Sequence, residues 1–523
     1  MATTHFLPAI DEDQVHRIAV EPAKASSEHT GQGPTVRQSN LLAATTTAVS
    51  TVYDTNGWDT VYVIPLPDVN TAIANKKTSP TTWSGSIAPT LFNPTKIDAT
   101  GTFSTWSLTT GGSGAIIRMH IPFGANITVT NGSVVTPVTV TGGIAFVEVK
   151  LVYIPQPPVD GVTPNNLKVR TAGGTADDPV VTVTSVSYTA PPEDSGLDTA
   201  LVTMLQGWFN ANLDQFQHVF ATVNLGTEEA TGDFTWLNPT QTNYAYIDNS
   251  NIDQALLGVL CMTENRPSTG NVQEISAGAI PPGARASFNM SLERFMSKMV
   301  LPSLPAEFPK APSGTFVLGN NDTQITASSN FDLAAVKVGA VNYTPTVTSY
   351  KMSLDGSIME TYSYIHTPIS PGIDAYCEIT YYSTMAIATK SDGSQSLTWL
   401  KAQNTDEKTW YTVATWVTVT EAVADIILAV IGAVVGNVVT AVESVVCRIL
   451  VAVLCGGVVS AIAAVLEQVP NWIAGSVPDA IPSVNALVDG ATKPTAWADS
   501  TDFTLTEVLI NAGLQLGGNP FSG

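Results

Sequence analysis

The stretch that decides the fold is Asp425–Leu466, DIILAVIGAVVGNVVTAVESVVCRILVAVLCGGVVSAIAAVL, whose 42 residues include only three charged side chains. As a single α-helix it would be about 63 Å long, roughly twice the thickness of a bilayer core. Its charges divide it into Ile426–Val442 and Ile449–Leu466, each near the lower length limit for a membrane span. Two interpretations follow: a membrane-inserting segment, or the buried axis of a soluble fold.

The distribution of small and polar residues favours the soluble fold. At about 100° per residue, one sector of about 100° holds Glu421, Asp425, Gly432, Gly436, Thr440, Glu443 and Cys447. A lipid-spanning helix gains nothing from aligned acids, whereas a helix sheathed by a curved sheet on most sides would turn such a stripe to solvent. Gly432 and Gly436 form a GxxxG pattern, common in transmembrane packing but equally suited to close approach of a strand or helix. We therefore expect a sheet-wrapped helix with Val438 in the core, and keep membrane insertion as the alternative.

Composition limits the classes of function. The chain has 523 residues, of which 44% are hydrophobic and only 13% charged, and its formal net charge is −22. The length indicates two to four domains. Nucleic-acid binding is excluded because no basic footprint is visible. The four cysteines include no CxxC pair, which predicts unpaired buried thiols.

The order of expected strands and helices along the chain predicts that it consists of two similar halves. Segments between Thr82 and Tyr188 alternate or run apolar over strand lengths, with Gly, Asn and Pro between them, which is typical of a β-meander. A helix is expected from about Ser195 to His218, with its apolar face formed by Leu197, Leu201, Met204, Leu205, Trp208, Phe209 and Phe216. Strand-like segments then run from about Gly314 to Val417 and lead into the apolar helix. This is a weak internal repeat of element order.

The predicted organisation has four parts. Residues 1–48 are polar and lack the basic and apolar regions of a secretory signal peptide, so we expect a mobile N-terminal tail and a soluble, cytoplasmic protein. The first module covers residues 49–225. The second covers residues 226–470 and ends in the long apolar helix. Residues 471–523 form a C-terminal extension that is rich in Pro and Ala.

Several motifs resemble a known bacterial family. They are NGWDTVYVIPLPDVN (Asn56–Asn70), GDFTWL (Gly232–Leu237), YAY (Tyr244–Tyr246), GVLCMTENR (Gly258–Arg266) and AIPPGARASFNMSLERFMSKMVLP (Ala279–Pro302). The chain is similar, over about Asn56–Leu466, to the clostridial forty-seven-kilodalton neurotoxin-cluster family, which is related to the OrfX proteins and belongs to the tubular lipid-binding (TULIP) superfamily. The resemblance implies an α+β fold of two TULIP-like modules, each a strongly curved antiparallel sheet wrapped around a long helix. It also implies release outside the cell together with a toxin complex.

Enzymatic motifs are missing from the sequence. It contains no GxSxG, HExxH, P-loop or GxGxxG pattern after a strand, and its six histidines are scattered. Asp11, Glu12 and Asp13 cluster, but a solvated acidic run explains them. We expect no catalytic residue, no cofactor and no metal site.

The sequence and the resemblance together predict a non-enzymatic accessory protein of a toxin gene cluster. It would bind a lipid or other amphiphile, proteins of the toxin complex, or both, and would touch membranes without a transmembrane span. Candidate lipid-lining residues are Met204, Trp208, Phe209, Val438 and Ile449. Each module is expected to have a narrow or closed interior. Two alternatives stay open: a membrane-inserting or pore-forming protein that uses residues 425–466, and an assembly subunit without a ligand.

Overall fold

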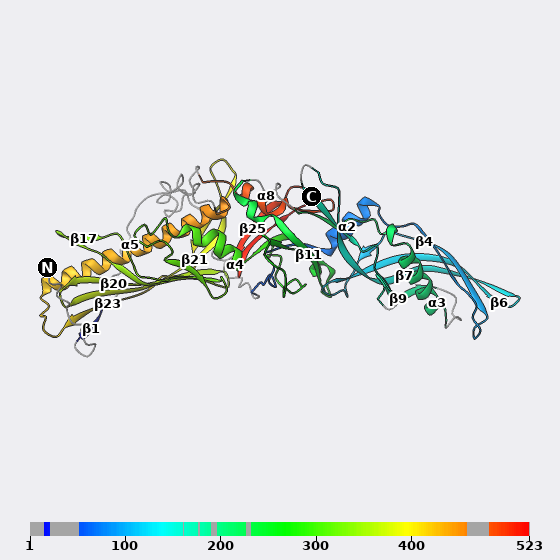
Figure 1. The fold of residues 1–523 in the computed structure, drawn as a ribbon, viewed down its shortest axis with the longest axis horizontal. Helices are drawn as coiled ribbons and strands as arrows, with labels where there is room; N and C mark the ends of the chain where they lie inside the picture. Colours follow the sequence, from blue (N-terminus) through cyan, green and yellow to red (C-terminus); the bar gives the residue numbers. More distant parts are fainter. Residues whose placement is uncertain are drawn as a thin grey trace, which may run out of the picture. The chain divides into compact units, whose positions relative to one another are not determined.

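The protein is divided into two compact units. The computed structural model describes residues 15–20, 52–159, 162–175, 178–189, 196–225, 232–457 and 481–521. We call Tyr53–Ser291 with Val488–Glu507 and Gln515–Gly523 the meander unit, and Met1–Val52 with Leu292–Leu487 and Val508–Leu514 the α5 unit. In Figure 1 the meander unit includes the blue to green strands and α3, and the α5 unit contains the long orange helix.

The meander unit consists of two sheets, one of which carries the α3 helix. Its helical elements are α2 (Leu66–Lys76), α3 (Leu197–Ala211) and the short turns Leu213–Gln215, Gly232–Leu237 and Ile252–Gln254; α8 (Asn485–Thr492) extends into it from the α5 unit. Its strands are β2 (Thr60–Pro65), β3 (Thr82–Ile87), β4 (Thr95–Phe103), β5 (Ser107–Leu108), β6 (Ile116–Asn131), β7 (Val134–Pro155), β8 (Thr163–Val169), β9 (Val181–Thr189), β10 (Ala221–Leu225), β11 (Pro239–Ile247), β12 (Leu256–Thr263), β13 (Ala286–Ser291), β24 (Thr495–Trp497), β25 (Thr504–Ile510) and β26 (Gly513–Asn519). Nine strands form the sheet β24-β10-β8-β7-β6-β4-β3, with β5 and β9 beside β6 and β7. Six form the sheet β11-β12-β2-β13-β26-β25.

The predicted meander and helix are confirmed. Along β6, buried and less buried residues alternate from Ile117 to Ile127, as the period of two requires for a strand with one covered face. The α3 helix contacts β3 and β9 and buries its apolar face, including Met204 and Phe209. It ends at Ala211 instead of His218. At its end the Asn212 side chain donates to the Trp208 carbonyl oxygen at 2.8 Å, a local bond that competes with further helix.

The α5 unit combines one long helix with a nine-stranded antiparallel sheet and a separate two-stranded one. Its strands are β1 (Val15–Val20), β14 (Phe316–Gly319), β15 (Gln324–Ala327), β16 (Phe331–Asp332), β17 (Val336–Val338), β18 (Val341–Tyr343), β19 (Thr346–Asp355), β20 (Ile358–Ser370), β21 (Ile373–Thr389), β22 (Gln395–Lys401) and β23 (Asp406–Ala414). Its helical elements are α4 (Leu292–Phe295), a π-helical turn (Met296–Val300), a 3-10 turn (Leu301–Ser303) and α5 (Glu421–Leu454). The sheet order is β1-β23-β21-β20-β19-β15-β14, with β16 beside β19 and β22 beside β21.

The α5 helix is covered on one side along its first half and on all sides in its last turns. Up to Val442 the buried positions recur at helical spacing and form one stripe: Ile427, Val430, Ile431, Val434, Val438 and Val442. From Val445 to Leu454 every residue is buried. The stripe of small and polar residues is exposed from Glu421 to Thr440, as predicted, but Cys447 is buried. The expectation of a helix wrapped on most sides is wrong for the first half, where Ile426 and Leu428 are exposed.

The decisive stretch does not form one helix. The α5 helix ends at Leu454, and Gly456 and Gly457 follow with φ of 64° and 87°, the left-handed conformation that closes many helices. The Gly457 N–H donates to the Ala452 carbonyl oxygen at 2.7 Å. A Cβ on Gly457 would lie 2.2 Å from the Lys298 carbonyl oxygen, so the position requires glycine. The rest of the expected second piece, residues 458–466, lies outside the described residues.

Three expectations about organisation differ from the structure. The segment Val15–Val20, expected in the mobile tail, is β1 and pairs with β23; the remainder of the tail lies outside the described residues. Residues 232–291 pack with the meander unit and not with the second module, because β12 and β13 both pair with β2. The expected C-terminal extension supplies β24, β25 and β26 to sheets. Apolar periodicity shows that a segment is a strand, but it does not show which distant strand it pairs with.

The fold class is α+β, with mostly antiparallel sheets and few helices. Strands run antiparallel wherever their register is defined, and the long hairpins β6–β7 and β20–β21 dominate the two nine-stranded sheets.

The facing of α5 gives a first prediction. Val438 is buried against the sheet side, whereas Thr440, two residues on, is exposed. Val438→Asp buries an unpaired charge and should lower the free energy of unfolding by about 3 kcal/mol or more. Thr440→Asp should change it little. Urea denaturation of both variants measures this, and equal effects would show that the facing is wrong.

Candidate functional site

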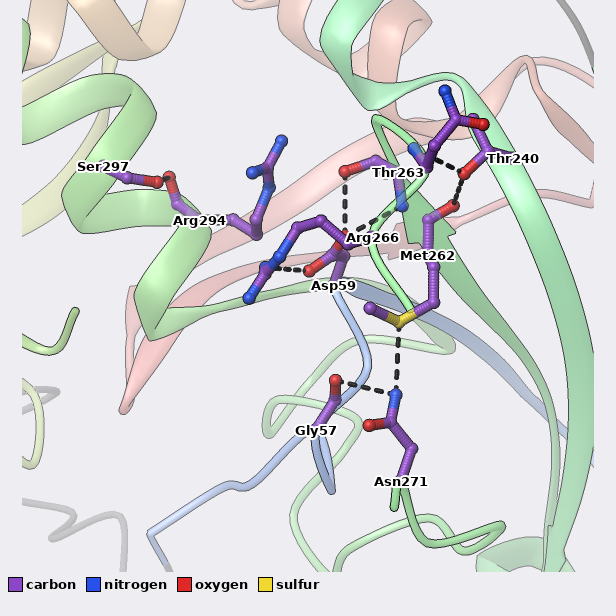
Figure 2. A network of polar contacts seen from close by, with 10 residues as sticks. Gly57, Asp59, Thr240, Met262, Thr263, Arg266, Asn271, Arg294 and Ser297 are labelled. Atoms are coloured by element: carbon purple, nitrogen blue, oxygen red, sulfur yellow. Dashed lines mark hydrogen bonds and ion pairs between the residues drawn. The ribbon is translucent and has the colours of Figure 1, made fainter. Parts of the chain in front are cut away.

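The most elaborate polar site in the described residues surrounds Asp59, at the start of β2 (Figure 2). The Asp59 carboxylate is buried and accepts hydrogen bonds from the Thr263 backbone N–H at 2.8 Å and the Thr263 hydroxyl at 3.0 Å. Its other oxygen receives the Arg266 guanidinium in an ion pair. Both partners come from the end of β12 and the turn that follows it. The groups that contact the two carboxylate oxygens are all hydrogen-bond donors, so the Asp59 carboxylate acts as an acceptor in a fixed orientation.

A second buried carboxylate, Asp68, lies in the first turn of α2, the helix that follows β2. Arg285, just before β13, donates from Nε to both Asp68 oxygens at 3.0 and 2.9 Å and pairs with them through Nη2 as well. The guanidinium also lies over the Phe521 ring, with its Cζ 5.3 Å from the ring centroid. A fork-like arginine contact of this kind fixes direction as well as charge. The pair therefore sets how α2 leaves the sheet.

A chain of amides continues the network between β13 and β26. Gln515 donates to the Asn289 side-chain oxygen at 2.8 Å, and Asn289 donates to the Ser287 hydroxyl at 2.9 Å and to the Val61 carbonyl oxygen at 3.2 Å. Ser287 donates in turn to the Ala279 carbonyl oxygen. All three side chains are buried. Such a network specifies strand register, because a shift by one residue would leave each of these groups unpaired.

These residues lie in the sequence motifs that carry the family resemblance. Asp59 and Asp68 belong to Asn56–Asn70, Thr263 and Arg266 to Gly258–Arg266, and Arg285 and Asn289 to Ala279–Pro302. The motifs thus converge on one sheet, and their polar residues bind one another. Sequence reasoning missed this site. The sequence does contain a signal for it: charged or amide residues lie inside or beside apolar strand segments. Because such residues are buried only when they are paired, they indicate a buried polar network.

Metal and thiol chemistry both depend on how the described His, Cys, Asp and Glu side chains are grouped and buried. Among the described residues no group of three or more His, Cys, Asp or Glu side chains could hold a metal ion. All four cysteines are free thiols. Burial raises the pKa of the Cys261, Cys377 and Cys447 thiols to about 12, which keeps them protonated and unreactive.

The interior of the meander unit is filled with aromatic side chains. Phe209 stacks on Phe103, with ring centroids 5.6 Å apart, and packs edge-on against Trp106 at 5.8 Å. Trp208 is half-buried beside Phe103. A cavity of about 20 Å³ lies between Trp106, Phe216 and His218. It holds about one water molecule.

The candidate lipid-lining residues occupy two different interiors. Met204 and Phe209 are buried in the meander unit, where Trp208 is half-buried on the same helix. Val438 and Ile449 are buried on α5. Their contact with a lipid stays a prediction.

Two charged side chains of the α5 helix, Arg448 and Glu443, have partners within the α5 unit. Arg448 donates from Nε to Glu307 at 2.7 Å, and Ser444 donates to the same carboxylate at 2.6 Å. The Tyr381 hydroxyl donates to Glu443 at 3.4 Å, and burial raises the pKa of Glu443. Two of the three charges in the decisive stretch are thus bound by side chains of the fold.

The Asp59 site predicts an ordered loss of stability. Asp59→Ala leaves the buried Thr263 N–H without its acceptor and removes the partner of Arg266, so the free energy of unfolding should fall by about 3 kcal/mol. Asp59→Asn keeps one acceptor oxygen, so its free energy of unfolding should lie between that of wild type and that of the alanine variant. Chemical denaturation measures the order. The control is Asp98→Asn, which breaks an exposed ion pair with Lys96 and should have little effect.

His218 predicts a loss of stability in acid. Burial lowers the pKa of His218 to about 4, from an ordinary 6.5, and Thr78 lies 3.0 Å from its Nδ1; Asp499 and Lys76, themselves an ion pair, are the charged groups that act on it. Between pH 6.5 and 4 the unfolded chain binds this proton and the folded chain does not. The difference in unfolding free energy between wild type and His218→Gln should therefore fall by about 3 kcal/mol across that window. A pH-independent difference, measured by urea denaturation, would contradict this.

Comparisons with known proteins agree with the fold and the motifs. The chain is 26% identical over 500 residues to the protein OrfX3 of Clostridium botulinum (strain Kyoto / Type A2), which covers 89% of this chain and 98% of the relative. It is 26% identical over 509 residues to the OrfX3 protein of Paraclostridium bifermentans, with the same coverage. The solved structure of P47 from Clostridium botulinum A2 matches with a TM-score of 0.56 at 18% identity, covering 90% of this chain and 98% of P47.

The family profile described as OrfX-like, Protein OrfX2/OrfX3/P47, matches residues 55–518, which includes the C-terminal strands that the sequence motifs did not reach. Because the match takes in both units and nearly the whole chain, the protein belongs to the OrfX-like family of OrfX2, OrfX3 and P47 proteins.

Proposed function

We propose that this protein is a non-enzymatic accessory protein of a bacterial toxin gene cluster, built from two TULIP-like modules, that binds amphiphiles and partner proteins through its surface. The observation that carries the proposal is the contrast between filled interiors and exposed apolar side chains. Bulky residues occupy the space beside α3 and α5, whereas several large apolar side chains lie outside. Membership of the OrfX-like family supports the toxin-cluster assignment.

Binding of an acyl chain in the cavity beside His218 is disfavoured by size. Ligand pockets usually measure about 300–1,000 Å³, and the cavity beside His218 measures about 20 Å³. A lipid that entered the meander unit would have to displace Met204, Trp208 or Phe209, which in this proposal act as plugs. In the α5 unit, Val438 and Ile449 would do the same.

The lack of catalysis is supported by how the polar residues are used. Asp59 and Asp68 are fully engaged by hydrogen-bond donors, and the buried thiols are held protonated. Neither carboxylate is left to act as a base.

A second candidate, membrane insertion by α5, rests on a specific observation. Among the described helices, only α5 is long and apolar enough to cross a membrane, and just 28% of its most apolar 18-residue window is buried. Extraction separates this candidate from the first. An accessory protein that binds through its surface leaves vesicles in high-pH carbonate, whereas an inserted α5 stays with the lipid.

The leading proposal predicts that no lipid is retained. Protein purified without detergent should yield less than one extracted acyl lipid per unit by mass spectrometry, and should still bind vesicles or products of the neighbouring toxin-cluster genes in pull-down experiments. One lipid per unit in the extract would contradict the filled interior. Binding to neither vesicles nor cluster proteins would contradict the proposed function and favour an assembly subunit without a ligand.

A further inference from the structure

Two neighbouring turns at one end of the meander unit expose large apolar side chains. Leu91 and Phe92 lie in the loop between β3 and β4 and are 93% and 95% exposed. Val134 and Val135 begin β7, directly after its turn from β6, and are 62% and 60% exposed. We call these four residues the apolar tip. Single exposed apolar residues are common, but four on adjacent turns form a patch that calls for an explanation.

The strand register places the two turns side by side. Thr95, at the start of β4, pairs with Asn131, at the end of β6, and Asn131 pairs with Val134. The loop that carries Leu91 and Phe92 therefore leaves the sheet next to the β6–β7 hairpin, and Figure 1 shows β4 and β6 running to the same end. The tip belongs to one sheet of one unit.

Both turns are closed by hydrogen bonds. The Thr90 N–H donates to the Asn93 carbonyl oxygen at 2.7 Å, and the Asn93 N–H donates to the Thr90 hydroxyl at 3.1 Å, so Leu91 and Phe92 stand between two bonded residues. In the hairpin, Gly132 has φ of 58°, as a two-residue turn requires. Ser, Asn, Asp and Gly usually fill such apex positions. Leu and Phe held there lose little conformational freedom when they bind.

The surroundings of the tip are uncharged in a chain of net charge −22. No Asp, Glu, Lys or Arg occurs in residues 78–95 or 121–147. Lys96 and Asp98, which follow in β4, pair with each other at 2.8 Å. Threonine, serine and asparagine make up most of the polar residues beside the tip. An acidic chain is repelled by anionic lipid surfaces, and the described residues of these two turns carry no charge that would oppose approach.

We propose that the apolar tip is a membrane-contacting site that inserts into the interface of a neutral, zwitterionic lipid bilayer. Rigid convex turns suit a surface that deforms around them, whereas a folded protein partner would need a matching groove. Apolar side chains at the interface bind in proportion to the area they bury, without anionic lipid. This proposal rests on the proposed function, in which the protein binds amphiphiles at its surface. It adds the residues that make the contact and the class of lipid.

Vesicle flotation tests the tip. Wild-type protein should float with phosphatidylcholine vesicles, and binding should change little when phosphatidylserine is added or when salt is raised from 0.1 to 0.5 M, since charge plays no part. Leu91→Ser/Phe92→Ser should weaken partitioning about 100-fold, and Val134→Ser/Val135→Ser should weaken it to a smaller extent. The matched control is Val341→Ser on β18, which removes a 50%-exposed valine from the α5 unit and should bind like wild type.

Insertion is measured separately by quenching. Phe92→Trp should show fluorescence quenched by brominated phosphatidylcholine beyond the signal of the native tryptophans, whereas Val341→Trp should not. Thermal denaturation of every variant should match wild type, because the substituted side chains are exposed.

The outcomes separate the tip from the proposed function. Wild-type flotation that survives both double substitutions overturns the tip and leaves lipid binding by the protein in place. Flotation only with phosphatidylserine, abolished by salt, overturns it as well, because an electrostatic site would then be responsible. Absence of flotation together with capture of a toxin-cluster protein through Leu91 and Phe92 overturns the lipid as the occupant, while the accessory function stands.

Discussion

The architecture of the meander unit depends on two buried carboxylates that bind residues distant in sequence. Asp59 holds Thr263 and Arg266, and Asp68 holds Arg285, across separations of 204 to 217 residues. A buried charge without a partner is strongly destabilising, so each aspartate permits only the arrangement that supplies its donors. β2 thereby acquires β12 and β13 as neighbours. The chain between β2 and β12 supplies eight strands of the nine-stranded sheet, and β24 supplies the ninth.

The parts of the fold that the sequence predicts are those with strong periodicity. The β6–β7 meander, the apolar face of α3 and the buried position of Val438 all follow from spacing, because one face of each element is covered and the other is not. The stripe on α5 holds from Glu421 to Thr440 and fails at Cys447, where tertiary packing closes around the helix on every side.

The pairing of strands that are distant in the chain could not be predicted from the sequence. β1 is a six-residue strand within a polar segment, and β24 has three residues, so neither offers a period to detect. The boundary expected near residue 225 differs from the structure because partners of β2 are set by the polar network and not by proximity in the chain. The two aspartates and two arginines of the family motifs are visible in the sequence, but only the folded sheet determines which aspartate pairs with which arginine. The apolar tip escaped notice for a related reason: Leu91, Phe92, Val134 and Val135 look like core residues until the register places them on turns.

The position of β26 has a consequence for synthesis. This strand, Gly513–Asn519, lies beside β13, and the Arg285 N–H donates to the Gly518 carbonyl oxygen at 3.1 Å. Until those residues leave the ribosome, β13 has a bare edge, with unpaired N–H and C=O groups that can template pairing with another chain. Contacts between segments so far apart also form slowly. The nascent protein is therefore most prone to aggregate in the interval between the release of β13 and the release of β26, more than 200 residues of translation later.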